Sequence, residues 1–259
     1  MTRALVTGAG KRLGRAMALY LAGRGFHVAV HYSGSAEAAE EVAAEITALG
    51  RRAVTLKADF LVEDEVAGLL TRALQALGGP ITCLVNNASI FEYDSVRSAT
   101  RESWDRHLES NLRAPFVLTQ AMAGQGLTAS ENAQGEPVAS GLIVNMIDQR
   151  VRKLTPEFMS YTIAKMGLWA MTRTTAQALA PAIRVNAIGP GPTLRGSRQS
   201  EEHFAAQRAA TILERGADMQ DITAALGYFL DAPAVTGQLL CVDGGQHLGW
   251  QTPDILGLE

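Results

Sequence analysis

The chain is poor in cysteine, has no excess of either charge and lacks a long apolar run, and each shortage excludes a class of protein. Two cysteines among 259 residues are too few for a disulfide-rich scaffold. A net charge of −3 offers no basic surface to nucleic acid or an anionic membrane. No uncharged apolar run reaches about 18 residues, and the first apolar run starts too early to follow a signal peptide. We therefore expect a cytoplasmic protein that binds a small-molecule substrate, without nucleic-acid or membrane partners.

The two cysteines lie in short apolar runs typical of buried strands. Cys83 falls within 81–85 and Cys241 within 239–242. We expect buried, reduced thiols at both positions, with no disulfide and no metal site.

Short apolar runs alternate with helical periodicity along most of the chain. The helical segments include 36–49 and 63–77, and the expected strands are 3–6, 26–31, 52–57, 82–85, 141–145, 184–187 and 238–242. This alternation predicts a single α/β domain over 1–259, a Rossmann-like doubly wound parallel sheet of about seven strands with helices on both faces. Ligands of such sheets bind at the carboxyl ends of the strands.

Some segments depart from this rhythm. The polar stretch 124–140 is expected to be a surface loop that is flexible at its centre. The segment 189–213 begins with glycines and prolines and continues as a helix, which is typical of a mobile substrate flap. The tail 246–259 has apolar side chains without a core pattern, so we expect it to pack against another subunit.

Glycines cluster directly after the first expected strand, at Gly8, Gly10 and Gly14. A strand-to-helix turn of this kind presents backbone N–H groups and a positive helix end to a pyrophosphate. The spacing differs from the common G-x-G-x-x-G pattern. A dinucleotide site is therefore one interpretation, and a turn without a ligand is the other.

Tyr161 and Lys165 are four residues apart in an expected helix that starts near the Thr155-Pro156 cap. Both side chains then lie on one helix face, where the ammonium lowers the pKa of the phenol and helps it to donate a proton. The alternative is a chance pair on a solvated face.

In order and spacing, the chain resembles the short-chain dehydrogenase/reductase family. The motifs that carry the resemblance are Thr7-Gly8, Asn86-Asn87-Ala88, Asn111, Tyr161 with Lys165, and Pro190-Gly191. The resemblance implies hydride transfer from a nicotinamide cofactor, with Tyr161 as proton donor. Lys165 would hold the nicotinamide ribose and tune the phenol, and Asn111 would support a chain of waters. A homodimer or homotetramer built on the helices of Asn111 and Tyr161 is also implied.

One position departs from the family pattern. The usual active-site serine, thirteen residues before the tyrosine, is Asp148. A carboxylate can relay a proton or bind the N–H groups of a heterocycle, but it donates to a carbonyl only when protonated. The alternative is that Asp148 merely pairs with Arg150 or Arg152.

Within the family, Asp148, Lys11-Arg12, the stretch 31–35 and Asn87-Ala88-Ser89 with Phe91 resemble pteridine reductases. The resemblance implies that Phe91 stacks a pterin against the nicotinamide. The substrate pocket would be lined by Arg12, Ser89, Phe91, Asp148 and Tyr161. Phe91 could instead be a core aromatic residue, and Arg12 could contact only a cofactor phosphate.

The end of the second expected strand favours NADPH. No acidic residue occurs in 26–36, where one would bind the ribose hydroxyls of NAD. Gly34 stands where pteridine reductases commonly have an arginine, and Asp59 matches the family's adenine contact or else caps a helix. The expected cofactor contacts are Gly8, Lys11, Arg12, Leu13, Gly14, His31, Ser33, Ser35, Asp59, Asn87, Ala88, Ser89, Tyr161, Lys165, Pro190, Gly191 and Thr193.

The sequence therefore predicts an NADP(H)-dependent oxidoreductase that reduces a pterin-like heterocycle. Its expected catalytic residues are Asn111, Asp148, Tyr161 and Lys165. The alternatives are the same machinery acting on a keto-acyl or sugar carbonyl, and a non-catalytic NADP(H)-binding regulator.

Overall fold

A parallel sheet of seven strands forms the centre of the computed structural model, which describes residues 2–196 and 199–252. The strand order is β3-β2-β1-β4-β7-β8-β9. The order reverses between β1 and β4, which places the ligand-binding crevice at their carboxyl ends. The strands are β1 Arg3–Val6, β2 His27–Tyr32, β3 Ala53–Lys57, β4 Cys83–Asn86, β7 Gly141–Met146, β8 Ile183–Pro190 and β9 Leu239–Val242.

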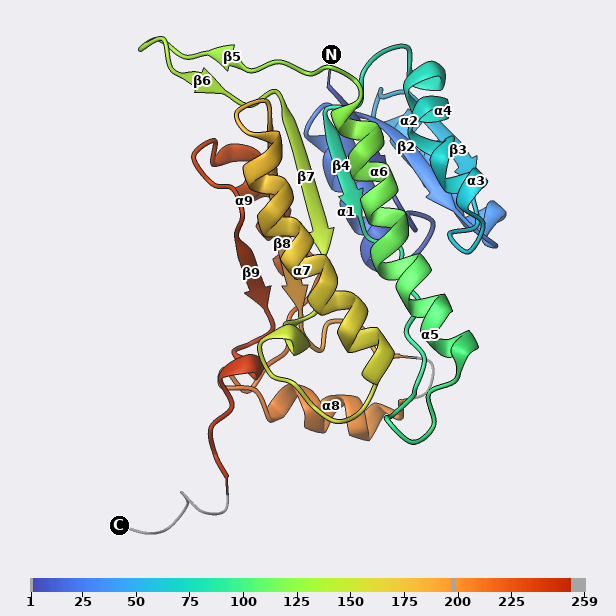
Figure 1. Cartoon of the computed structure of the whole chain (residues 1–259), viewed down its shortest axis with the longest axis vertical. Coiled ribbons are helices and arrows are strands. Elements are labelled where there is room, and N and C mark those ends of the chain that lie inside the picture. Colours follow the sequence, from blue (N-terminus) through green and yellow to red (C-terminus); the bar gives the residue numbers. More distant parts are fainter. Residues whose placement is uncertain (1, 197–198, 253–259) are drawn as a thin grey trace.

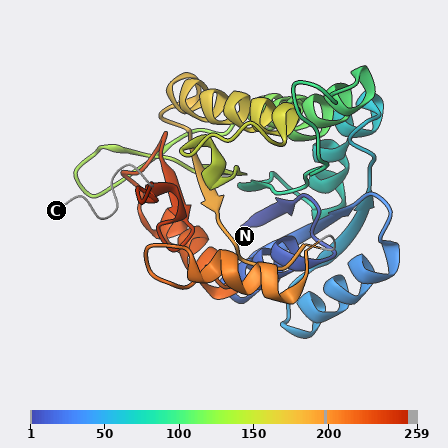
Figure 2. The same ribbon diagram turned by 90° about the horizontal axis from the view of Figure 1, so that it is seen from below.

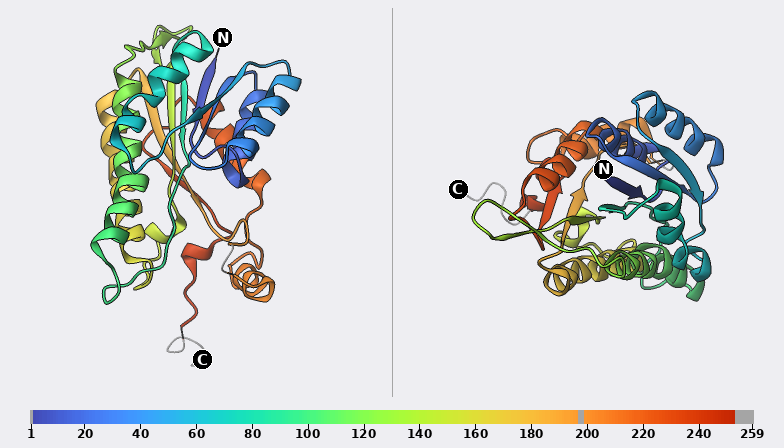
Figure 3. Two further views of the ribbon diagram at one scale, coloured as in Figure 1. Left: turned by 90° about the vertical axis from the view of Figure 1, so that its right-hand side faces the viewer. Right: turned by 90° about the horizontal axis from the view of Figure 1, so that it is seen from above.

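Helices cover both faces of the sheet (Figure 1). One layer holds α1 Arg12–Gly23, α2 Ala36–Ala48 and α9 Met219–Asp231, and the other holds α3 Glu63–Ala67, α4 Leu69–Leu77, α6 Ala114–Ala123 and α7 Met159–Leu179. Figure 2 shows the green and yellow helices on one side of the sheet and most of the blue and orange helices on the other. In the left view of Figure 3 the strands run between these layers, and α8 Glu201–Ala209 lies at their carboxyl ends.

Alternate strand residues supply the two halves of the core. In β1, Ala4 and Val6 pack against the layer of α1, whereas Leu5 packs against the layer of α4. All three are fully buried. A strand buried on both faces must be apolar throughout, which explains why the strands are continuous apolar runs in the sequence.

The predicted fold class is confirmed, since each expected strand is present and the sheet is parallel. The predicted helix over 63–77 is wrong in one respect, because it breaks at Gly68 into α3 and α4. Glycine is a poor helix former, and this explains the position of the break. The predicted start of α7 at Thr155-Pro156 is also wrong. The helix begins at Met159, because Phe158 adopts a left-handed conformation with φ of 56°.

The stretch 124–140 contains a short antiparallel hairpin, β5 Ser130–Glu131 and β6 Pro137–Val138, where a loop was expected. Figure 1 shows the hairpin beyond the amino ends of the strands, far from α8. Of the tail 246–259, the described part includes a short 3-10 helix, Gln246–Leu248, and its residues 253–259 lie outside the described part. Cys83 is buried as expected, whereas Cys241 is partly exposed. In the described part of the chain, every helix is too short or too polar to cross a membrane.

Candidate active site

A cavity of about 570 Å³ opens at the carboxyl ends of the strands. This volume lies within the usual range of small-molecule sites. The glycine turn, several strand ends and α7 all contribute to its walls. The expected site residues that line it are Gly8, Lys11, Arg12, Leu13, Gly14, His31, Ser33, Asp59, Asn87, Ala88, Ser89, Phe91, Asp148, Tyr161, Lys165, Pro190, Gly191 and Thr193.

The turn after β1 lets a ligand approach the protein backbone closely. Gly8 has φ of 61°, and a Cβ on Gly14 would lie 2.1 Å from the carbonyl oxygen of Gly8. Asn87 Nδ2 donates to Thr7 O at 2.8 Å and thereby ties β4 to the turn. Lys11, at the start of α1, makes no side-chain capping bond. The first N–H groups of α1 therefore lack a side-chain cap, as a pyrophosphate site requires.

The ring of His31 connects two segments of the cavity wall through hydrogen bonds. Its Nδ1 accepts from the N–H of Gly8 at 3.0 Å, so Nε2 carries the hydrogen and donates to Ala58 O at 3.0 Å. Burial lowers the pKa of His31 to about 4. The neutral ring stacks on Phe60 with centroids 4.4 Å apart. Both nitrogens are thus committed to the backbone.

The other residues expected around the adenosine differ in position. Ser33 lines the cavity, whereas Ser35 stands at the N-cap of α2. Asp59 lines the cavity and accepts from the N–H of Leu61 at 3.0 Å. The N-cap of α3 is Val62, so Asp59 does not cap that helix.

Tyr161 and Asp148 are joined directly. The phenol O–H donates to Asp148 Oδ2 at 3.0 Å, and Asp148 Oδ1 accepts from the N–H of Arg150 at 2.7 Å. The guanidinium of Arg150 donates to Thr155 Oγ1 instead of pairing with the carboxylate. Burial raises the pKa of Asp148, and burial followed by the nearby Asp148 charge raises that of Tyr161. The prediction that the phenol has a lowered pKa beside Lys165 is therefore wrong, because these two influences dominate.

Lys165 lies one helical turn after Tyr161. Its Nζ donates to Met146 O at 2.8 Å and lies 5.7 Å from the centroid of the Tyr161 ring. Burial lowers the pKa of Lys165 to about 8. The lysine therefore changes charge near pH 8.

Asn111 supports the site from behind, since it is fully buried and lies outside the cavity lining. It belongs to a π-helical turn, Glu109–Arg113, between α5 Arg101–Leu108 and α6. Such turns are frequent at functional sites. The side-chain amide donates to Ile90 O at 2.8 Å and accepts from Ile90 N–H at 2.9 Å. Asn111 thus fixes the backbone immediately before Phe91.

Phe91 is too exposed to be a core residue. Its side chain is 44% exposed and stacks on Phe158, with ring centroids 4.4 Å apart and planes 13° apart. It also meets the Tyr161 ring edgewise at 4.7 Å. Phe91 thus stands beside the Tyr161 ring with a flat apolar surface.

Arg12 reaches the opposite wall, the segment after β8 that the sequence predicts to be a flap. It adopts φ of 54°, which explains why many turns would have glycine there. Nη1 donates to Arg195 O at 3.0 Å and Nη2 to Leu194 O at 3.1 Å. Residues 197–198 of the expected flap lie outside the described part.

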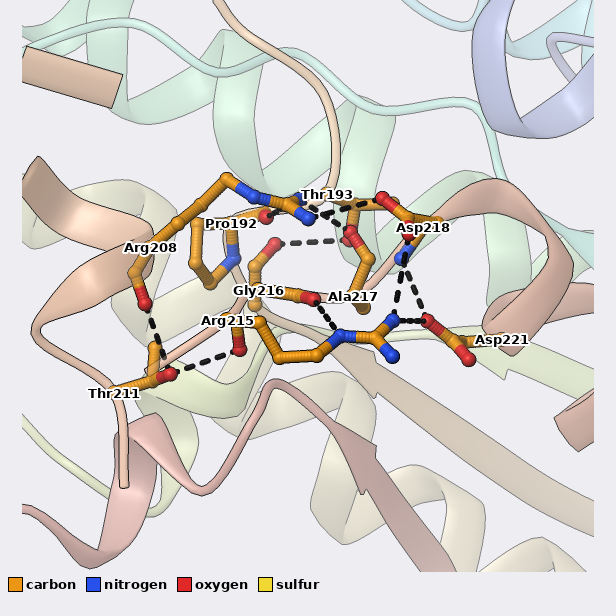
Figure 4. Close-up of polar contacts among 10 residues, drawn as sticks. Pro192, Thr193, Arg208, Thr211, Arg215, Gly216, Ala217, Asp218 and Asp221 are labelled. Atoms are coloured by element: carbon orange, nitrogen blue, oxygen red, sulfur yellow. Dashed lines mark hydrogen bonds and ion pairs between the residues drawn. The ribbon is translucent and has the colours of Figure 1, made fainter. Parts of the chain in front are cut away.

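A network of arginines holds the base of the flap (Figure 4). Arg208 Nη1 donates to Pro192 O at 3.0 Å and to Ala217 O at 2.7 Å, and Nη2 pairs with Asp218 at 3.0 Å. A Cβ on Gly216 would lie 2.2 Å from Pro192 O, so the two segments touch. This network places Thr193 in the cavity wall.

Several cavity residues were not predicted. Some directly extend predicted strands, and position alone would have found them. Phe60 gave no sequence signal, because its role depends on the ring of His31. The additional lining residues are Ala58, Phe60, Leu61, Ile90, Ser110, Met146, Ile147 and Leu194.

A doubly wound sheet with a glycine turn and a buried Tyr-Lys pair at its carboxyl edge defines a Rossmann-like oxidoreductase. The family profile described as Enoyl-(Acyl carrier protein) reductase matches residues 8–247. The 3-oxoacyl-[acyl-carrier-protein] reductase FabG of Staphylococcus epidermidis is 31% identical over 250 residues, which cover 95% of this chain and 98% of that protein. The chain therefore belongs to the short-chain dehydrogenase/reductase family, as its sequence predicted.

Solved structures add two kinds of relative. The FolM alternative dihydrofolate reductase 1 of Brucella suis, in complex with NADP, is 43% identical, with a TM-score of 0.90 and 98% of each chain covered. The landomycin C-6 ketoreductase LanV, with bound NADP and rabelomycin, is 30% identical, with a TM-score of 0.83 and 96% and 97% of the chains covered. The resemblance to pteridine-type reductases is confirmed, and ketone reductases are also similar.

Proposed function

We propose that the protein is an NADPH-dependent reductase of a pterin-like heterocycle. The observation that carries the proposal is the hydrogen bond of 3.0 Å between the Tyr161 phenol and the Asp148 carboxylate inside the cavity. A carboxylate binds the N–H edge of a heterocycle well, whereas a simple ketone calls for a hydroxyl donor. Phe91 adds a flat, half-exposed ring beside that pair.

The glycine turn and the end of β2 suit NADP(H). The turn accepts a pyrophosphate without side-chain interference. Ser33, Lys11 and Arg12 line the cavity without an acidic residue from 26–36 beside them, so nothing from β2 repels a 2′-phosphate. The Brucella suis relative was crystallised with NADP. NADPH supplies the hydride when it is bound.

The remaining chemistry belongs to this chain's side chains. Tyr161 shifts its O–H from Asp148 to the substrate and donates the proton to the nitrogen or oxygen of the C=N or C=O group, and Asp148 then binds the substrate's polar edge. Lys165, charged below a pKa of about 8, stabilises the phenolate that forms. Asn111 keeps the segment of Phe91 in place.

Reduction of a ketone is the second candidate. The names of FabG and LanV describe keto substrates, and Tyr161 with Lys165 would serve that reaction equally well. A regulator that only binds NADP(H) fits less well, because it needs neither a buried Tyr-Lys pair nor a carboxylate on the phenol.

The test compares kcat/KM for a dihydropterin and for a β-keto thioester, with Asp148→Ser and Phe91→Ala. We expect wild type to prefer the pterin, Asp148→Ser to lose more pterin than ketone reduction, and Phe91→Ala to raise mainly the KM for pterin by about threefold to tenfold. Asp105→Ser, at an exposed carboxylate paired with Arg101, is the control. If wild type does not reduce the dihydropterin, or if Asp148→Ser raises kcat/KM for both substrates alike, reduction of a ketone replaces reduction of a pterin as the proposed function.

We also propose that copies of the chain associate through the helices that carry Asn111 and Tyr161. An apolar groove of about 350 Å³ lies on those helices, lined by Leu108, Leu112, Phe116 and Met171 among others. Ile163 and Met166 of α7 are each 38% exposed. Sedimentation equilibrium should give a dimer or tetramer, and Phe116→Glu should shift it toward monomer.

Both free thiols suit the reducing cytoplasm, which we propose as the location.

A further inference from the structure

Behind Tyr161, three buried side chains form a hydrogen-bonded chain that the proposed reaction does not use. Asp94, Ser160 and His107 are 1%, 0% and 0% exposed. Ser160 Oγ donates to Asp94 Oδ2. His107 Nε2 accepts from the N–H of Glu92 at 3.1 Å, so the neutral ring carries its hydrogen on Nδ1, which donates to Ser160 Oγ at 2.7 Å.

This hydrogen-bonded network joins parts of the molecule that are distant in sequence. Asp94 lies in the loop between β4 and α5, His107 lies in α5, and Ser160 lies in the first turn of α7. Asp94 Oδ1 also accepts from the N–H of Ser160 at 3.1 Å, and its carbonyl accepts from Met159 at 3.3 Å. Phe158, the N-cap of α7, has no side chain that can cap the helix. Asp94 therefore provides the acceptors for the first N–H groups of α7.

Both ends of this hydrogen-bonded network lie next to the proposed active site. Ser160 immediately precedes Tyr161, and Glu92 immediately follows Phe91. The His107 ring packs edgewise on the Tyr161 ring at 6.0 Å, and the Phe91 ring does so at 4.7 Å. A displacement of His107 would therefore move the loop of Phe91 and loosen the packing of the phenol.

We propose that Asp94, Ser160 and His107 are positioning residues that fix the Phe91 loop against Tyr161, and that protonation of His107 releases this loop. A protonated His107 has N–H on both ring nitrogens. Its Nε2 could then no longer accept from Glu92, and two N–H groups would face each other. The role rests on the proposed functions of Tyr161 and Phe91, but the position of the loop can be measured without them.

Burial and the surrounding charges together set the pH at which His107 becomes protonated, and burial has the larger effect. Asp94 and Glu92 from the loop favour protonation, and Arg106 on the same helix opposes it. The uncharged Tyr161 faces it from α7. Burial is the largest influence and lowers the pKa of His107 below its usual 6.5. The loop should therefore be held at neutral pH and released only at a pH below that at which an ordinary histidine becomes protonated.

Two substitutions at His107 separate its two hydrogen bonds. His107→Gln keeps an acceptor near the Nε2 position and so retains the bond from Glu92, whereas His107→Asn keeps only the group near Nδ1. We expect His107→Asn to raise the KM for substrate by about tenfold, and His107→Gln by about threefold or less, with the Kd for NADPH unchanged. Wild type should show a rise in this KM in acid that His107→Gln lacks.

Hydrogen exchange of the Glu92 amide reports on the loop independently of activity. We expect fast exchange in His107→Asn at neutral pH, slow exchange in His107→Gln, and acid-accelerated exchange in wild type only. His27→Gln is the matched control, because His27 Nδ1 also accepts a backbone N–H, from Arg52 at 2.9 Å, at the other end of the sheet. That variant should leave Glu92 exchange and the KM unchanged.

Thermal unfolding identifies a variant that does not fold, in which case Ser160→Ala takes its place, with fast Glu92 exchange expected. Equal Glu92 exchange in His107→Asn and His107→Gln, or wild-type exchange without acid acceleration, overturns the proposal. If wild type reduces no pterin but the exchange results hold, the proposed function fails and the positioning role stands.

Discussion

The two walls of the cavity are held by different kinds of interaction. On the wall of Tyr161, Ser160 and His107 are fully buried, and Ser160 hydrogen-bonds both to His107 and to Asp94. On the flap wall, Arg208 binds backbone carbonyls and pairs with Asp218, and these side chains are 23% and 62% exposed. Salt screens the exposed pairs but hardly affects the buried bonds. The comparison teaches that one wall is fixed by buried bonds and the other by exposed ones; we call them the stiff wall and the soft wall.

The largest effect should come from the stiff wall. Tyr161→Phe removes the proton that the phenol donates, and kcat should fall by about a hundredfold or more while NADPH still binds. Stopped-flow single-turnover rates and a fluorescence titration of NADPH measure the two. Tyr228→Phe, at an exposed tyrosine of α9, is the control. Turnover near that of wild type would show that the Tyr-Lys pair is not the catalytic unit.

The pH profile of kcat/KM tests Lys165 on the same wall. Burial lowers its pKa to about 8, so it is charged below that pH and neutral above it. The charged form stabilises the phenolate, and the rate of reduction should therefore fall as the pH rises through about 8, by about tenfold for each further unit. Lys165→Arg stays charged and should lose this limb, whatever rate remains. A wild-type profile that is flat from pH 7 to about 9 contradicts the assignment.

Much of the stiff wall could be predicted from the sequence, because its parts are local or repeat a pattern. The strands appear as apolar runs, and Tyr161 with Lys165 needs only helical spacing. The start of α7 could not be predicted, since it depends on the left-handed turn at Phe158 and on the bond from the N–H of Ser160 to Asp94, 66 residues away. His31 was expected at the cofactor because it is polar. The sequence did not show that both of its ring nitrogens hydrogen-bond to the backbone, at Gly8 and at Ala58. Such long-range partners leave no periodic signal.

Cofactor preference depends on the far end of the cavity, between the two walls. Because β2 ends without a carboxylate, NADPH should bind about tenfold or more tightly than NADH, equivalent to roughly 1.4 kcal/mol. Fluorescence titration of both cofactors measures this ratio. Ser33→Asp should reverse the preference by repelling the 2′-phosphate, whereas Ser35→Asp, at the N-cap of α2, should change it less. Equal affinities in wild type would remove the argument from the end of β2.

The smallest effect should come from the soft wall. Arg208→Gln loses bonds to Pro192 O and Ala217 O, so Thr193 is held less firmly in the cavity wall. The Kd for NADPH should rise about fivefold, or roughly 1 kcal/mol, while the single-turnover rate at saturating cofactor stays near that of wild type. Arg215→Gln is the matched control, because its guanidinium pairs with Asp218 and Asp221 and donates to Gly216 O, but makes no bond to Pro192 O or Ala217 O. Added salt should weaken NADPH binding less in Arg208→Gln than in wild type, since one screened interaction is already missing. If Arg208→Gln instead lowers the single-turnover rate as strongly as it weakens binding, both walls serve the chemistry and the contrast between them disappears.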